Sequence, residues 1–160
     1  MAAKNGVSDP AMAPIMAGVF GATGSRHALI VHADDGLDEL SVTSPTSVLE
    51  MRGGGGEFEV TEWRVDPMAL GFAPATLADL RGGNAAFNAG VIRAVLEGKR
   101  GAHRDIGILN AAAALIVAGR VDDLEGGLVL AAESIDSGRA VDVLDALIAT
   151  SRDALQRQPG

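Results

Sequence analysis

The densest group of side chains that could do chemistry is acidic and lies in the first quarter of the chain. Four carboxylates fall within six residues, at Asp34, Asp35, Asp38 and Glu39. Carboxylates this close repel one another unless water solvates them or a cation pairs with them. Mg²⁺ typically takes one or two protein carboxylates, while water and substrate phosphates fill its other positions. The cluster is therefore either a solvated acidic turn, since Asp-Gly is ordinary turn chemistry, or one side of a magnesium-phosphate site.

A strand is needed to position this cluster. The run HALIVH at 27–32 is short, apolar and rich in branched residues, which indicates a buried strand of a parallel sheet. The acidic residues follow its carboxyl end directly, which is where α/β sheets usually bind ligands. A buried strand needs neighbours on both sides, so we expect most of its sheet to be missing from this chain.

The other elements before residue 65 are a helix and short strands. Ser8-Asp9-Pro10 predicts a helix start, and the helix continues to Phe20. Alternating apolar residues predict a second strand at 39–43 and a β-hairpin with arms at 47–52 and 57–64. Four consecutive glycines join the two arms. No Lys-Ser/Thr and no helix start follow them, so they indicate a hairpin tip rather than a phosphate-binding loop.

The rest of the chain shows only helical spacing. Three helices are predicted to stop near Gly98, Gly119 and Gly138. A fourth carries apolar residues from Val141 to Leu155, and the tail at 156–160 is expected to fray. The fold class is therefore α/β, with short strands and a β-hairpin followed by four helices.

Composition excludes several classes of function. The net charge is −8 and the 13 Lys and Arg residues are scattered, so no basic surface exists for nucleic acid. The chain has no Cys, which excludes a disulfide scaffold, a thiolate metal site and a Cys nucleophile. No signal-like segment or membrane-spanning run is found, so we expect a cytoplasmic protein without a membrane partner.

Other polar residues are expected to have structural roles. Asn88 and Asn110 lie in Ala-rich helices, where a buried Asn more often binds backbone groups than a substrate. Trp63 is expected to pack in the hairpin. His103 and Arg104 begin a helix, and we expect them to form a solvated face.

Between Gly6 and Gly138 the chain carries a series of short sequences in a defined order. They are GVSDP, ALIVH, DGLDE, TSPTSVLE, RGGNAAFNA, RAVLEG, LNAAAAL and SIDSG. Their order and spacing resemble the carboxy-terminal half of the anthranilate phosphoribosyltransferases, which belong to glycosyltransferase family 3 and the class IV phosphoribosyltransferases. The resemblance implies that residues 1–155 form a single, incomplete α/β domain of the nucleoside phosphorylase/phosphoribosyltransferase type.

The resemblance also implies an activity. It is transfer of a phosphoribosyl group from phosphoribosyl pyrophosphate to the amino nitrogen of anthranilate in tryptophan biosynthesis, which would make the chain a pentosyltransferase. In that family the Asp-Glu pair of DGLDE helps to hold Mg²⁺ against the pyrophosphate, and this pair corresponds to Asp38 and Glu39. A pyrophosphate leaving group develops charge that a metal can neutralise. No catalytic or substrate-binding position is identified in this chain.

Several of the family's features have no counterpart here. These are its GTGGD phosphate loop, its KHGNR segment, the Arg that helps to hold anthranilate and the amino-terminal helical domain. In addition, Asn84 stands where the family commonly has Asp. We therefore expect the isolated chain to be inactive, to expose apolar surface, and to self-associate or need a complementing chain. The alternative is a non-catalytic remnant, or an α/β module with a binding or structural role.

Overall fold

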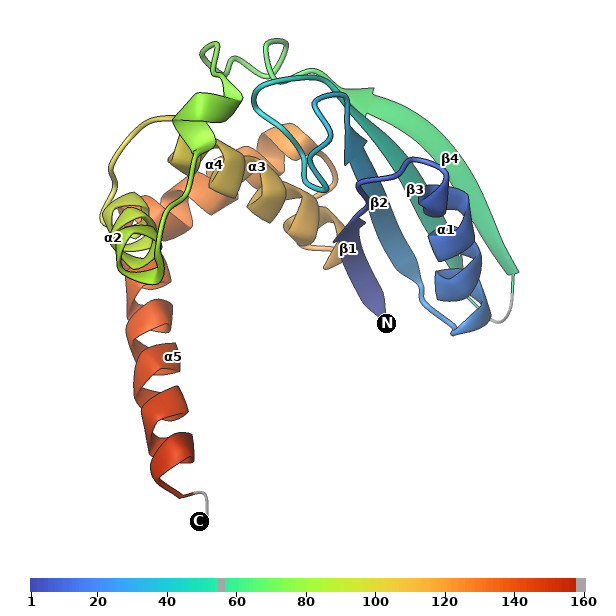
Figure 1. Cartoon of the computed structure of the whole chain (residues 1–160). Coiled ribbons are helices and arrows are strands. Elements are labelled where there is room, and N and C mark those ends of the chain that lie inside the picture. The colour runs from blue at the N-terminus through green and yellow to red at the C-terminus, as the bar shows by residue number, and fades with distance from the viewer. Residues whose placement is uncertain (55–56, 158–160) are drawn as a thin grey trace.

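A four-stranded sheet and five α-helices make up the described part of the chain, residues 1–54 and 57–157 of a computed structural model (Figure 1). The strands are β1 Ala2–Gly6, β2 His27–Ala33, β3 Thr46–Gly54 and β4 Glu57–Val65. The helices are α1 Met12–Ala22, α2 Ala85–Leu96, α3 Ala102–Val117, α4 Leu124–Asp136 and α5 Arg139–Gln156, with a 3₁₀ turn, η1, at Leu77–Leu80. This confirms the predicted α/β class.

The sheet has the order β1-β2-β3-β4 and mixed direction. β1 runs parallel to β2, whereas β3 and β4 form antiparallel pairs. The predicted buried strand is confirmed as β2, in which Ala28 to Val31 are all buried. β2 is nevertheless paired on both sides, and one of its neighbours is antiparallel. The expectation that most of its sheet is missing therefore does not hold for β2, and among the described strands β1 and β4 form the two edges of the sheet.

The predicted strand at 39–43 is wrong, because these residues lie in the loop between β2 and β3. Leu40 and Val42 are buried, which produced the alternating pattern, but Ser41 between them is also fully buried. Ser41 donates its backbone N–H to Thr46 Oγ1 at 3.0 Å and so takes no part in a strand ladder. The hairpin is confirmed as β3 and β4. Its predicted tip includes residues 55–56, which lie outside the described residues.

The predicted helices are confirmed with small shifts at their ends. α1 begins at Met12, because Asp9 Oδ1 accepts the Ala11 N–H at 2.9 Å in a turn that precedes the helix. Asn84 caps α2 by accepting the Phe87 N–H at 2.9 Å. α5 continues to Gln156, and residues 158–160 of the predicted tail lie outside the described residues.

Helices cover both faces of the sheet. α1 packs on one face, where Ala17 meets Ile30 and Met51 in an apolar cluster. α3 packs on the other face, where Leu109 and Ile116 belong to the larger core cluster. The two halves of the core therefore lie on opposite sides of β2 and β3.

The molecule has the form of an arch. The sheet lobe, defined as β1–β4 with α1, forms one leg, and α5 forms the other (Figure 1). The accessible surface is 9342 Å² for a chain of 16.3 kDa, whereas a compact monomer of that mass exposes about 7,500 Å². Neither α2 nor α5 has a buried residue. Within the described residues, no helix is both long and apolar enough to cross a bilayer.

Candidate functional site

The acidic cluster lies in the loop between β2 and β3, beside the carboxyl end of β1. Asp38 and Glu39 are both exposed there. Gly6, the last residue of β1, approaches the backbone of Asp38 so closely that a Cβ at Gly6 would lie 1.4 Å from the Asp38 carbonyl oxygen. Only glycine can occupy this position. The ends of β1 and β2 together therefore fix where the two predicted metal ligands lie.

Asp35 anchors the loop rather than facing a ligand. Its carboxylate accepts the Leu37 N–H at 3.1 Å, the Ser41 hydroxyl at 2.7 Å and the Thr43 hydroxyl. Burial raises the pKa of Asp35, but the hydrogen bonds from Thr43, Ser41 and Leu37 outweigh it and lower that pKa below its ordinary value. Asp35 is thus a structural carboxylate that gives the loop its shape.

The other three carboxylates differ in their partners. Asp34 Oδ2 lies 2.5 Å from Arg64 Nη2 of β4. Glu39 forms an ion pair with Lys4 of β1, whose side chain is only 12% exposed. Among the described residues, no group donates a hydrogen bond to the Asp38 carboxylate. Asp38 is therefore free to take a ligand, and Glu39 would share its charge between Lys4 and that ligand.

Asn110 of α3 holds the acidic loop through the backbone of Leu40. Its Oδ1 accepts the Leu40 N–H at 2.9 Å, and its Nδ2 donates to the Leu40 carbonyl at 2.9 Å. Asn88 makes the same pair of bonds with Gly83, at 2.7 and 3.1 Å. The predicted backbone-binding role is confirmed for both Asn residues. In the case of Asn110, that role positions the residue that follows Glu39.

The donor set suits a magnesium ion that a substrate also binds. Asp38 and Glu39 provide hard carboxylate oxygens, which Mg²⁺ prefers, at an exposed place with room for other ligands. Within the described residues, no group of three or more His, Asp or Glu side chains could hold a metal ion alone. Two carboxylates are enough for Mg²⁺ when phosphates and water complete its coordination.

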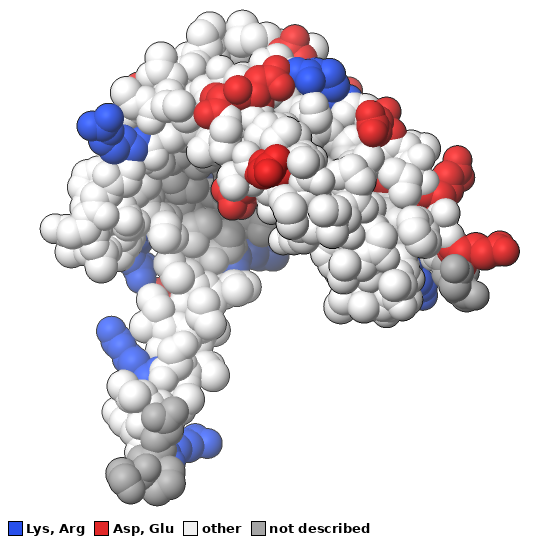
Figure 2. All heavy atoms as spheres, turned by 45° about the vertical axis from the view of Figure 1, so that its right-hand side comes forward, with Lys and Arg blue, Asp and Glu red and all other residues white. Residues whose placement is uncertain are grey.

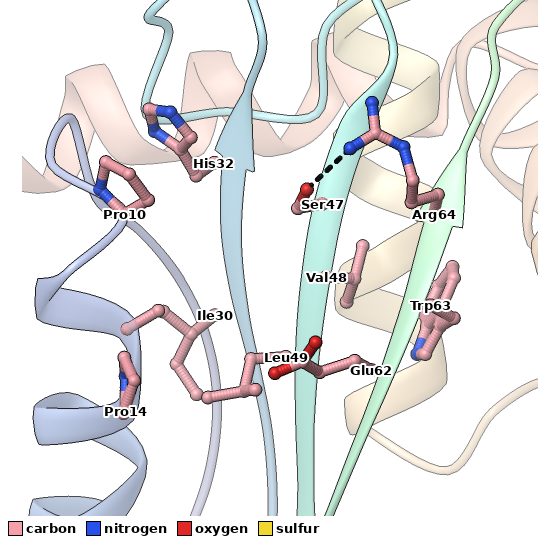
Figure 3. Close-up of a pocket in the computed structure, with 11 residues that line it drawn as sticks. Pro10, Pro14, Ile30, His32, Ser47, Val48, Leu49, Glu62, Trp63 and Arg64 are labelled. Atoms are coloured by element: carbon pink, nitrogen blue, oxygen red, sulfur yellow. Dashed lines mark hydrogen bonds between the residues drawn. The ribbon is translucent and has the colours of Figure 1, made fainter.

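A groove that does not include the acidic loop lies on the α1 face of the sheet (Figure 3). It is a groove of about 510 Å³ whose lining includes Pro10, His32, Ser47 and Arg64. His32 Nδ1 bonds the Val7 carbonyl at 2.9 Å, and Arg64 donates to Ser47 Oγ at 2.9 Å. These polar groups already have protein partners. The groove also lies on the β3 and β4 side of β2, whereas Asp38 and Glu39 lie on the β1 side.

Comparison with known proteins decides the family. The model of the family described as "Glycosyl transferase family, a/b domain" matches residues 3–141. The chain belongs to this glycosyl transferase family. The anthranilate phosphoribosyltransferase of Paramagnetospirillum magneticum is 49% identical over 134 residues, which are 84% of this chain and 38% of that relative.

Solved structures of the glycosyl transferase family share the fold. The Thermus thermophilus anthranilate phosphoribosyltransferase is similar with a TM-score of 0.79 and 31% identity, over 92% of this chain and 42% of that one. A Saccharomyces cerevisiae enzyme of the same name, solved with Mg bound, gives 0.77 and 25% identity over 88% and 40%. This chain thus corresponds to a carboxy-terminal part of these enzymes and spans about 40% of their length.

Sequence reasoning missed three residues of this family member. Lys4 and Gly6 lie in β1, whose sequence AAKNG carries no strand pattern. Arg104, which was predicted to be solvated, is instead 1% exposed, and its Nη2 lies 2.9 Å from Asp136 Oδ1. Arg104 stands four residues before Ile108, on the buried face of α3, and that spacing is the signal that could have found it.

His103 is half-buried. Trp63 packs against the core, and its Nε1 donates to Glu50 Oε2 at 3.0 Å, which fits its expected packing role.

Proposed function

We propose that this chain supplies the magnesium-diphosphate side of a phosphoribosyl-transfer site. In the completed enzyme, a phosphoribosyl group passes from phosphoribosyl pyrophosphate to anthranilate and pyrophosphate leaves. The observation that carries the proposal is the pair Asp38 and Glu39, exposed side by side where β1 and β2 end. Asp35 and Asn110 hold the loop of this pair in place. Relatives up to 49% identical are named for this activity.

The chemistry assigns each group a task. A bound Mg²⁺ would neutralise charge that develops on the departing diphosphate. Asp38 and Glu39 provide its protein oxygens, and Lys4 orients the Glu39 carboxylate from β1. Asp35 keeps the loop closed through the Ser41 and Thr43 hydroxyls, so the two ligands are held before substrate binds.

The remaining tasks belong to parts of the enzyme beyond this segment. Phosphoribosyl transfer requires the ribose and the aromatic amine to be positioned together, and the chain spans about 40% of its relatives. We therefore expect the isolated chain to bind Mg²⁺ with pyrophosphate but not to turn over substrate. The non-catalytic alternative predicts that neither binding nor turnover depends on Asp38 and Glu39.

Calorimetric titration of Mg²⁺ with pyrophosphate into the full chain tests the proposal. Asp38→Asn and Glu39→Gln should each weaken binding by about tenfold or more, which corresponds to ~1.4 kcal/mol. Asp153→Asn, which removes another exposed carboxylate on α5, should leave binding unchanged and serves as the matched control. If the double variant binds magnesium pyrophosphate as well as the unmodified chain does, the proposal is wrong.

A further inference from the structure

The groove on the α1 face of the sheet has a polar end and an apolar floor (Figure 3). His32, Ser47 and Arg64 stand opposite one another on β2, β3 and β4, so they form one row across the sheet. The next row on the same face contains Ile30 and Leu49, which are both buried and also line the groove. The groove therefore begins at a polar row beside the acidic loop and continues over apolar side chains.

The groups of the polar row are paired with one another or with the backbone. His32 Nδ1 donates to the Val7 carbonyl at 2.9 Å, and Arg64 donates to Ser47 Oγ at 2.9 Å. Arg64 also forms an ion pair with Asp34 of the acidic loop, at 2.5 Å, so its positive charge is balanced by a neighbour. The row thus closes one end of the groove without offering an unpaired charge to a ligand.

Glu62 of β4 is the charged group of the groove that has no partner among the described residues. It stands opposite Leu49 in the register of the sheet. Figure 3 shows its side chain reaching from β4 across β3, so that the carboxylate lies over the apolar floor. A ligand that fills the groove displaces water from this carboxylate, and a cationic group on the ligand compensates for that loss.

The walls and the surrounding charge restrict the ligand further. Pro10, Ala13 and Pro14 form the wall on the α1 side. The volume of about 510 Å³ lies within the range of roughly 300–1,000 Å³ that is usual for small-molecule sites. Figure 2 shows Asp and Glu predominating over Lys and Arg around the sheet lobe, and the net charge of the chain is −8. Both features attract cations and repel anions.

We propose that this groove binds a small organic amine. The protonated amino group pairs with Glu62, and an apolar body of about the size of an aromatic ring packs against Leu49 and the α1 wall. Glu62 is exposed, so its ion pair chiefly selects the charge of the ligand, whereas apolar contact supplies most of the affinity. The groove does not include Asp38 or Glu39, so this inference is independent of the proposed function.

Methyl NMR titrations of the full chain with three probes of similar shape test the proposal. The probes are 2-phenylethylamine, which is a cation at neutral pH, the neutral 2-phenylethanol and the anion phenylacetate. The amine should shift the methyl signals of Ile30 and Leu49 and should bind about three- to fivefold more tightly than the alcohol. Phenylacetate should bind most weakly, because Glu62 repels it.

Variants of the groove separate charge from shape. Glu62→Gln should remove the preference for the amine, and Glu62→Lys should reverse it, so that phenylacetate binds best. Glu59→Gln is the matched control, because Glu59 is exposed on the same strand but on the opposite face of the sheet. Ala13→Trp, which fills the groove, should abolish binding, whereas Ala11→Trp at an exposed position outside the groove should not. Circular dichroism of each variant checks that it folds.

Three results would each overturn the proposal. They are equal or absent binding of the three probes, methyl shifts confined to another part of the molecule, and an amine preference that survives Glu62→Gln. Asp38→Asn should leave amine binding unchanged, because Asp38 does not line the groove. The effect of that variant on magnesium pyrophosphate therefore tests the proposed function alone.

Discussion

Asp35 shares its loop with three other carboxylates, but its oxygens face donors of the loop itself. It accepts hydrogen bonds from Leu37, Ser41 and Thr43. Asp38 and Glu39, three and four residues later, remain exposed. Asp35 thus holds the loop, whereas Asp38 and Glu39 of the same cluster can bind a ligand. A substitution at Asp35 should act on stability first and on binding only through the loop.

Asp35→Asn should lower the free energy of unfolding by about 1–3 kcal/mol at pH 7, because three donors lose an ionised acceptor. The folded-state pKa of Asp35 lies below its ordinary value of 3.8. Its stabilising contribution is therefore present above pH 3.8 and is lost as the pH falls through the folded-state pKa. Urea unfolding of both proteins at neutral and acid pH should show the difference shrinking in acid.

Asp105 provides a control, because its substitution should change stability in the opposite direction. Burial raises its pKa, and the charges of Arg104 and Arg100 offset this only in part. Ionised Asp105 therefore costs stability at neutral pH, and Asp105→Asn should gain stability there but not in strong acid. A pH-independent effect at Asp35, or the same sign at both positions, would contradict this assignment.

At the residue scale, type and spacing drew attention to the acidic cluster, and the family resemblance implied that Asp38 and Glu39 are its metal-binding pair. Neither predicted how the roles divide within the cluster. Residue type alone does not distinguish the four carboxylates within these six residues. Which of them is anchored depends on Ser41 and Thr43 turning back toward Asp35, and on Lys4 arriving from a strand that pattern reasoning did not find.

Among the elements, α3 connects the core to the acidic loop. Asn110 replaces a strand partner for Leu40 by bonding both its N–H and its carbonyl. Asn110→Ala should leave both backbone groups unpaired, cost about 1–3 kcal/mol, and speed hydrogen exchange at the Leu40 amide. It should also weaken binding of magnesium pyrophosphate, because Glu39 precedes Leu40 directly.

Asn88→Ala is the control for this prediction. Asn88 makes the same two bonds to Gly83 but at an exposed site on α2, distant in sequence from the acidic loop. It should not change magnesium pyrophosphate binding. If the two variants lost magnesium pyrophosphate affinity to the same extent, Asn110 would act through general stability rather than by positioning the loop.

The elements were predictable where one local signal set them. Glycines and helical spacing placed α2 to α5 within a few residues, and the glycine run marked the hairpin. The segment at 39–43 was misread because burial of Leu40 and Val42 comes from tertiary contacts that imitate strand alternation. β1 was missed because its burial depends on β2 and α3, not on an apolar pattern of its own.

For the whole molecule, the arch should unfold in two steps. α2 and α5 have no buried residue, whereas the sheet lobe contains most of the fully buried core. The helical signal at 222 nm should therefore begin to fall at lower urea than the fluorescence of Trp63, the only Trp. Coincident transitions would contradict this view.

The arch itself could not be predicted, although the exposed apolar surface was expected. Local patterns predict the elements. The angle between α5 and the sheet instead depends on the contacts of α5 with α4 and α2, among them the pair Arg93 Nη2 and Asp145 Oδ1 at 2.9 Å. Val143 and Leu147 of α5 remain 68% and 61% exposed, so the sequence carries an apolar face without saying where it points.

The two borders of the sheet differ in charge. β4 carries Glu57, Glu59 and Glu62, and nearly all of its side chains are exposed. Open-ended polymerisation would require the β1 border of one molecule to meet the β4 border of the next, repeatedly. Like charges along β4 discourage any strand from joining it. The charged β4 border therefore works against head-to-tail association of sheets, so an open border at β1 does not commit the protein to fibre formation.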